Sequence, residues 1–461
     1  MQALFDAVNA ICGKIQVVSD LFWEFPTNFG WYAAIPIFGN FSLAIILLVG
    51  TGIFLTFRFR FVQVRKFKYG LKVLLHSKAA TKTGISALAA FLLSTAMRVG
   101  PGNILGVTGA ISIGGPGALF WMWLSAFFGM STAFAESTLS QIFKEKRDGQ
   151  YVGGLPFYGR RLLNNAAWAG VALSVLYIVY AFLCFPAQGF NTISAVGAIA
   201  NEITGTTIAT NSTLYWISFV VLILIAALIS FGGIKKVTKV TDLLVPVMAV
   251  IYVLTVVVLV VCNFTRIPWF FQAVFGQAFS PDAVFGGAFG TVLSQGIKRG
   301  LMSNEAGQGT ITMPAAAADA NHPCDQGCVQ AIGVFLDTIV ICTLTGFVVI
   351  MGRMWTTDRA AEWFDMGKLD KFLASCGELT GQSGAYQIVT FLVSICFGLF
   401  AFTTLCCDIT YSEIAAHKVS DKKGVIKAVR VAGAFVFVPL GTLTVLSGLQ
   451  LDNLWAVSDL V

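Results

Sequence analysis

Long apolar runs alternate with short polar segments along almost the whole chain. Ten of these runs approach or exceed the roughly 20 residues that a helix needs to cross a bilayer. Their limits are 38–57, 87–113, 117–141, 168–200, 215–232, 243–262, 283–313, 329–352, 386–415 and 428–448. Several are longer than one straight span requires, so we expect tilted or broken helices among them. The pattern predicts an all-α polytopic membrane protein.

Composition supports this prediction and excludes other classes. Of the 461 residues, 56% are hydrophobic and 11% are charged, against about 25% charged residues in an average soluble protein. A soluble enzyme needs more polar surface, and a disordered chain has far less apolar content. The sequence carries no Walker motif, and we expect no cofactor and no enzyme activity.

The basic residues lie in short blocks between apolar runs, and most of the 30 lysines and arginines fall in segments 58–82, 142–165, 233–241 and 416–430. A nucleic-acid-binding protein would instead carry them on the face of a soluble domain, so we expect no nucleic-acid partner. The positive-inside rule assigns these segments to the cytoplasm. We therefore expect the N-terminus outside and a plasma membrane location of the bacterial type. The sequence does not specify an oligomeric state.

Two apolar runs are interrupted by glycine, asparagine and charge. Run 87–113 contains RVGPGNILG at 98–106, and run 283–313 contains GLMSNEAGQGT at 300–310. Pro101 breaks a helix because it lacks an N–H and clashes with the preceding turn. The two runs lie five spans apart and cross in opposite directions, which indicates the binding site of a transporter built from inverted repeats. The alternative is a pair of glycine-rich helices that pack closely.

At four stretches the chain resembles the alanine/glycine:cation symporters, also called sodium:alanine symporters, of the amino acid-polyamine-cation superfamily. They are RVGPGNILGV at 98–107, GGPGALFWMW at 114–123, SNEAGQG at 303–309 and GVFLDTIVICTLT at 333–345. The resemblance implies a LeuT-like inverted five-plus-five repeat with one extra N-terminal span. Residues 1–86 would hold the extra helix and a basic loop, 87–262 the first repeat, and 283–461 the second. It also implies import of alanine or glycine with sodium, or sometimes with protons.

Three features depart from the family pattern. The family usually has Gly-Thr-Gly-Asn where this chain has Gly-Pro-Gly-Asn at 100–103. A tryptophan is usual in the ninth span where this chain has Asp408. The family continues into one more apolar helix after the segment that ends this chain, so we expect four helices in the second repeat and a fold that ends before the last helix.

The resemblance and the residue chemistry together suggest two sets of ligands. The substrate set rests on glycine N–H groups, amides and polar side chains at the breaks and comprises Gly100, Gly102, Asn103, Gln188, Gly307, Gly309, Thr404 and Asp408. The sodium set rests on oxygen ligands, which suit a hard cation, and comprises Val99, Gly100, Thr403 and Thr404. The alternatives are local: Asn103 bonding its own unwound backbone, the threonines bonding the preceding turn, and Gln188 packing in a polar core.

The roles of the carboxylate side chains within the apolar runs can be interpreted in more than one way. Asp408 enlarges the pocket and makes it acidic, which suits a larger or cationic amino acid, or it carries a proton for a proton-coupled transporter. The remaining alternative is that Asp408 faces cytoplasmic water or pairs with a basic residue. Glu305 caps a half-helix, pairs with Arg98, Lys298 or Arg299, or contacts substrate. We expect Glu136 and Asp337 to make interhelix contacts. An ion channel is a rival function, although no filter-like carbonyl ring is evident.

Overall fold

The computed structural model describes most of the chain. Described residues are 6, 10, 13–14, 17–21, 23–35, 39, 41–77, 81, 83–147, 149–210, 212–279, 288–381, 384–420 and 422–446. The expectation of a missing last helix falls on 447–461, which lie outside the described residues. The predicted extra N-terminal span is described from residue 41 onward.

Helices account for most of the described chain. They are α2 (Gly30–Ala33), α3 (Leu43–Arg58), α4 (Val62–Arg65), α5 (Phe67–Leu75), α6 (Ala87–Arg98), α7 (Gly102–Gly114), α8 (Ala118–Ile142), α9 (Leu155–Leu162), α10 (Ala167–Thr204), α11 (Thr213–Ser230), α12 (Gly233–Cys262), α13 (Ile267–Ala278), α15 (Ala288–Asn304), α16 (Thr312–Ala317), α17 (Pro323–Val334), α18 (Thr343–Gly352), α19 (Ala360–Asp365), α20 (Lys368–Thr380), α21 (Gly384–Val419), α22 (Lys423–Ala432) and α23 (Val438–Leu446). Short 3-10 turns lie at Phe264–Arg266 and Met354–Thr356, and π-helical turns join α17 to α18 (Phe335–Cys342) and α22 to α23 (Gly433–Phe437).

Each of the ten predicted runs contains helix. Within the described ranges, six helical spans are long and apolar enough to cross a membrane, and the bent pair of α6 and α7 makes a seventh. Helix α3 and the apolar part of α11 are shorter, and the run at 283–313 is divided between α15 and α16. The all-α membrane architecture is therefore confirmed.

Local sequence explains several helix ends. Ser42 and Ser86 precede α3 and α6, and each side chain accepts a hydrogen bond from a backbone N–H three residues on, at 3.3 Å and 3.0 Å. These bonds satisfy donors that have no partner within the helix. Helix α10 ends at Gly205, which has a φ of +65°, and glycine adopts this left-handed conformation at little cost.

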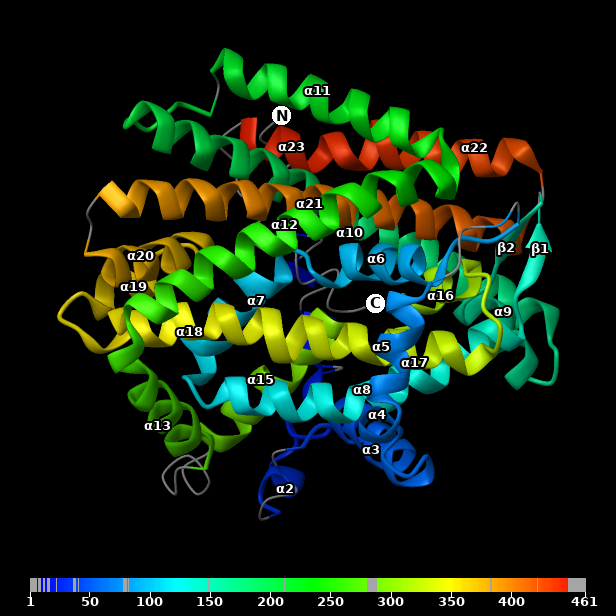
Figure 1. The fold of residues 1–461 in the computed structure, drawn as a ribbon, viewed down its shortest axis with the longest axis horizontal. Helices are drawn as coiled ribbons and strands as arrows, with labels where there is room; N and C mark the ends of the chain where they lie inside the picture. The colour runs from blue at the N-terminus through cyan, green and yellow to red at the C-terminus, as the bar shows by residue number, and fades with distance from the viewer. Residues whose placement is uncertain are drawn as a thin grey trace.

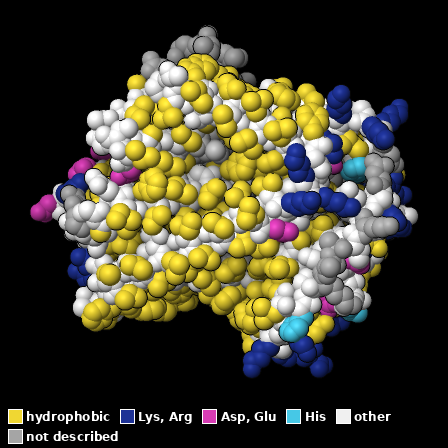
Figure 2. Space-filling view, turned by 45° about the horizontal axis from the view of Figure 1, so that its top comes forward, with side chains coloured by type: hydrophobic (Ala, Val, Ile, Leu, Met, Phe, Trp, Pro, Cys, Tyr) yellow, Lys and Arg dark blue, Asp and Glu magenta, His cyan; other side chains and the backbone are white. Residues whose placement is uncertain are grey.

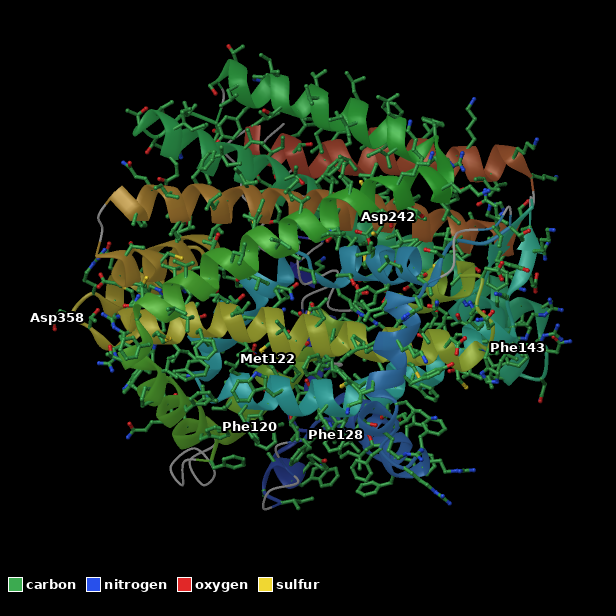
Figure 3. All side chains as sticks on the ribbon, viewed as in Figure 1. Phe120, Met122, Phe128, Phe143, Asp242 and Asp358 are labelled. Atoms are coloured by element: carbon green, nitrogen blue, oxygen red, sulfur yellow. The ribbon has the colours of Figure 1, made fainter. Side chains whose placement is uncertain are left out.

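The long helices lie side by side along the longest axis of the molecule (Figure 1). The two-stranded hairpin of β1 (Glu145–Arg147) and β2 (Gln150–Val152) lies beside α9 at one end. Helices α19 and α20 lie at the opposite end, where Asp358 is labelled in Figure 3, while Asp242 lies on α12. Helices α10 and α21 pack against each other at the centre of the bundle.

The surface has an apolar zone and a separate basic region, as a membrane protein requires. Figure 2 shows hydrophobic side chains across the middle of one face and Lys and Arg side chains gathered toward one end. Large side chains of α11 are exposed, including Trp216 and Ile217, which suits contact with lipid. Two of the predicted basic segments meet, because Lys418 of segment 416–430 lies 2.9 Å from Glu145 of segment 142–165. Arg430 lies 2.5 Å from Glu413 of α21.

Candidate functional site

The first break lies between α6 and α7, which are bent by 41° relative to each other. Val99 leaves the helical conformation, with φ −79° and ψ 77°, and α7 begins directly after Pro101. The Gly102 N–H has no backbone acceptor among the described residues. This first break therefore leaves a helix N-terminus, which attracts negative charge.

The second break separates α15 from α16. Glu305, Gly307 and Gly309 have φ values of +56°, +89° and +79°. Glycine accepts this conformation readily, whereas for Glu305 it is strained. The run 305–311 therefore lies unwound within an otherwise apolar region, as the sequence predicted.

A cavity of about 400 Å³ lies between the two breaks. Its wall also includes side chains of α10 and α21. Six of the predicted ligands line it: Gly100, Gly102, Gln188, Gly307, Thr404 and Asp408. The other four, which are Val99, Asn103, Gly309 and Thr403, are described residues that do not line it. Segments far apart in the sequence thus meet at one hollow.

Asn103 stabilises the first break instead of facing the cavity. Its Oδ1 accepts a 2.9 Å hydrogen bond from the Gly100 N–H, and its Nδ2 donates to Asp337 Oδ1 at 2.6 Å. It also lies 3.2 Å from Ser303 Oγ. In this geometry the amide bonds its own unwound backbone, as the local alternative describes, and a contact between Asn103 and the substrate stays a prediction.

Asp337 joins the two breaks, which specifies the partners of the interhelix contact expected of it. The residue is fully buried in the π-helical turn Phe335–Cys342. Its Oδ1 accepts the bond from Asn103, and its Oδ2 accepts bonds from Ser303 Oγ and Thr338 Oγ1, both at 2.8 Å. One carboxyl group therefore ties α7 to the end of α15.

Carboxylate groups of the chain itself accept hydrogen bonds from polar groups of the second break. The Gly307 N–H donates to Glu136 Oε1 at 3.1 Å, and Thr310 Oγ1 donates to Glu305 Oε2 at 2.8 Å. Gly309 packs against Leu155, since a Cβ there would lie 2.9 Å from the Leu155 Cβ. Glu136 thus accepts the bond from the Gly307 N–H that was predicted to bind a substrate carboxylate, and the substrate-binding role of Gly307 and Gly309 stays a prediction.

Arg98 is the buried cation of this region. Its Nε donates to the Asn304 carbonyl at 3.0 Å, and its guanidinium packs so closely on Gly333 that a Cβ there would lie 1.8 Å from Nη1. It interacts electrostatically with the buried carboxyl groups of Glu136, Glu305 and Asp337, while Nη1 and Nη2 have no hydrogen-bond acceptor among the described residues. Its positive charge therefore lowers the cost of burying these acids.

The two adjacent threonines of α21 point to different partners. Thr404 Oγ1 lies 3.2 Å from the Ala96 carbonyl and 2.8 Å from the Phe400 carbonyl, and a Cβ on Gly100 would lie 2.7 Å from it. Thr403 Oγ1 donates to the Leu399 carbonyl and lies 3.7 Å from Met248 Sδ on α12. Only the Thr404 hydroxyl of this pair therefore reaches the first break.

Three buried carboxyl or amide oxygens on the cavity wall have no hydrogen-bond donor among the described residues. They are both carboxyl oxygens of Asp408 and the Oε1 of Gln188. Asp408 is 1% exposed and Gln188 is 5% exposed, so bulk water does not replace the donor. An unpaired buried carboxylate is costly, which makes Asp408 the least satisfied acid of the cavity. The alternative of an aspartate facing cytoplasmic water is corrected.

Comparison with known proteins agrees with this geometry. The family model described as the sodium:alanine symporter family matches residues 32–461. The amino-acid carrier protein AlsT of Bacillus subtilis is 35% identical over 90% of this chain and 82% of its own length. The probable sodium/glutamine symporter GlnT of the same organism is 34% identical over 91% of this chain and 82% of its own. The sodium/alanine symporter AgcS of Methanococcus maripaludis is 38% identical over 67% and 68%.

A solved structure shows the same fold. The crystal structure of MhsT in complex with L-phenylalanine matches 83% of this chain and 97% of that chain, with a TM-score of 0.54 and 15% sequence identity. The LeuT-like fold expected from the sequence is therefore confirmed, as is the expectation of a transporter and not an enzyme. The chain belongs to the sodium:alanine symporter family.

Proposed function

We propose that this protein imports a small amino acid of the alanine/glycine class together with sodium, by alternating access around the cavity. The observation that carries the proposal is the cavity of about 400 Å³ between two broken helices. Residues 87–262 and 283–461 would form its two inverted repeats. The basic end would face the cytoplasm of a bacterial-type plasma membrane, with the N-terminus outside.

The first break supplies the partner for the substrate carboxylate. Gly102 lines the cavity, and a Cβ there would meet nothing within 4 Å. Its N–H stands at the N-terminus of α7, where unpaired N–H groups and the helix dipole favour an anion. We place the substrate carboxylate at the Gly102 N–H, beside Gly100, with Asn103 as a positioning residue that accepts the hydrogen bond from the Gly100 N–H.

Sodium would bind where α21 meets the first break. We assign to the ion the Thr404 hydroxyl, the Ala96 carbonyl 3.2 Å from it and the carbonyls of Val99 and Gly100 in the adjacent unwound segment, because oxygen ligands suit a hard cation. When Thr404 donates its proton to the Phe400 carbonyl, at 2.8 Å, its lone pairs remain for the ion. Because the same segment holds the substrate carboxylate, ion and substrate binding are coupled.

Uptake of labelled alanine into proteoliposomes tests the proposal. We expect saturable uptake that an inward sodium gradient raises at least about ten-fold. Thr404→Val removes one ligand and should raise the half-saturating sodium concentration about ten-fold, which corresponds to about 1.4 kcal/mol. Thr403→Val is the matched control and should change it little, because that hydroxyl faces Met248. Non-saturable ion flux without substrate would favour a channel instead.

A second candidate function is proton-coupled transport of a larger or cationic amino acid. The observation that favours it is the Asp408 carboxyl, which is buried on the cavity wall without a donor among the described residues. Such a group is more stable when it is protonated or when it pairs with a cationic ligand. In the first state Asp408 would determine which ion is coupled to transport, and in the second it would determine which substrate binds.

Asp408→Asn separates the two candidates. If Asp408 carries the proton, uptake driven by a pH gradient without sodium falls at least ten-fold in the variant. If sodium alone drives alanine uptake, the variant keeps most of the wild-type rate. Asp242→Asn, on the exposed surface of α12, controls for loss of a charge. Lysine and glutamine should be included, since uptake of only these substrates would assign Asp408 to side-chain recognition.

A further inference from the structure

A second cavity, of about 450 Å³, lies where the end of α3 meets α4, within the predicted basic segment 58–82. Its wall shares no residue with the cavity between the breaks. Four cationic side chains line it: Arg58, Arg60, Arg65 and Lys66. The wall also includes the aromatic rings of Phe59 and Phe134, whose centroids are 5.4 Å apart. The hollow thus combines concentrated positive charge with aromatic surface.

The backbone turn after α3 brings these cations together. Arg60 and Phe61 are successive non-glycine residues with φ values of +52° and +55°, a conformation that is retained only where the surroundings enforce it. The Phe61 N–H donates to the Thr56 carbonyl at 2.8 Å, and Arg65 Nη2 donates to the Phe59 carbonyl at 3.1 Å. The last turn of α3 and the start of α4 (Val62–Arg65) therefore face one hollow.

The cations are not neutralised within the described structure. Asp325 is the acidic residue in the wall, and both of its oxygens are in use: Tyr69 Oη donates to Oδ1 at 2.7 Å, and the His322 N–H donates to Oδ2 at 3.1 Å. The bond to Asp325 and burial raise the pKa of Tyr69 to about 12, so this donor stays protonated near neutral pH. Among the described residues no salt bridge joins Arg58, Arg60, Arg65 or Lys66 to an acid.

The surroundings of the hollow suit an amphiphile. Phe54 and Phe57, on the last turns of α3, are each 63% exposed, and Phe61 is 40% exposed. The rings of Phe57 and Phe61 make a T-shaped contact at 5.3 Å. Exposed phenylalanine side chains suit the acyl-chain region of a bilayer, and a basic cluster directly beyond them suits the headgroups at the cytoplasmic side. A lipid at this position has its chains beside Phe54 and its headgroup beside Arg58.

We propose that this cavity binds the phosphodiester headgroup of an anionic phospholipid, with the acyl chains against Phe54, Phe57 and Phe61. Guanidinium groups bind phosphate oxygens in a bidentate manner, and basic pockets at the cytoplasmic ends of helices are typical sites for anionic lipids. The inference depends on the chain lying in a membrane and not on which amino acid it carries.

Native mass spectrometry of the full-length protein in a neutral detergent tests the proposal. Phosphatidylglycerol and phosphatidylcholine with identical chains are titrated separately. We expect phosphatidylglycerol to remain bound at concentrations about ten-fold lower than phosphatidylcholine. The double variant Arg58→Gln/Arg60→Gln should abolish this preference. Equal retention of the two lipids by the wild-type protein would overturn the proposal.

A matched control separates a specific site from general charge. Lys423→Gln/Lys427→Gln removes the same charge from α22, also among the predicted cytoplasmic segments, and should keep the preference. An equal loss in this variant would overturn the proposal, as would competition by soluble glycerophosphate at the concentrations at which the lipid binds. Sodium-driven uptake and thermal unfolding of both variants show whether they are folded, so failure here is distinguishable from failure of the proposed transport function.

Discussion

Asp337→Ala is expected to abolish uptake and to lower the free energy of unfolding by about 3 kcal/mol or more. The substitution leaves the buried donors of Asn103, Ser303 and Thr338 without their acceptor, and each unsatisfied donor costs about 1–3 kcal/mol. It also removes a negative charge next to Arg98. Because Asp337 holds both breaks, the loss disorders the substrate and ion sites together.

Thermal unfolding in detergent and alanine uptake measure the two effects of Asp337→Ala. Asp337→Asn should lie between wild type and alanine, because the amide oxygen still accepts a bond while the charge is lost. Asp242→Asn is the control, since Asp242 lies on the exposed face of α12. Uptake by Asp337→Ala at the wild-type rate would show that the two breaks hold their geometry without this carboxyl.

Gly441→Ala is expected to destabilise the protein by about 3 kcal/mol or more, and mostly unfolded protein should be recovered. An ideal Cβ at this position would lie 1.7 Å from the Pro186 carbonyl oxygen, so α23 must move away from α10. Overpacking of this kind against rigid backbone exceeds the usual cost of one added methyl group. Gly189 shows the same close approach from α10, with a Cβ at 2.9 Å from the Val438 carbonyl.

Gly424→Ala provides the matched comparison for Gly441→Ala. Gly424 lies in α22, and a Cβ there would meet nothing within 4 Å. Alanine favours the helix over glycine by up to about 1 kcal/mol, so this variant should be neutral or slightly more stable. Fluorescence-detected size-exclusion chromatography after heating compares the variants. Equal melting temperatures for the two would contradict the close contact between α10 and α23.

The sequence predicted the helices and breaks well because both are encoded locally. Apolar length determines where a span forms, and Pro101 and the glycines at 307 and 309 interrupt helices through their own backbone chemistry. The LeuT-like fold followed from motif order. The cavity lining was predicted for residues on the breaks and on the inward face of α21, such as Thr404 and Asp408.

The remaining contacts could not be predicted because they join distant residues. Asn103 and Asp337 are 234 positions apart, and nothing near Asn103 in the sequence indicates which acid it meets. Thr403 and Thr404 are indistinguishable as a sequence pair, and only helix rotation decides which hydroxyl faces the break. Glu136 was expected to make an interhelix contact, and the structure adds that its partner is the backbone N–H of Gly307.

Helix α21 carries a mechanical consequence. It runs without interruption for 36 residues, or about 54 Å at 1.5 Å per residue, and bears Thr404 and Asp408 near its middle and Lys418 near its end. Lys418 Nζ forms an ion pair with Glu145 Oε1 of the hairpin at 2.9 Å. A continuous helix moves largely as one body, so a tilt at its middle also moves its end. Any tilt of α21 that reshapes the cavity must therefore strain the ion pair between Lys418 and Glu145. The position of the hairpin thus depends on the state of a cavity that it does not line.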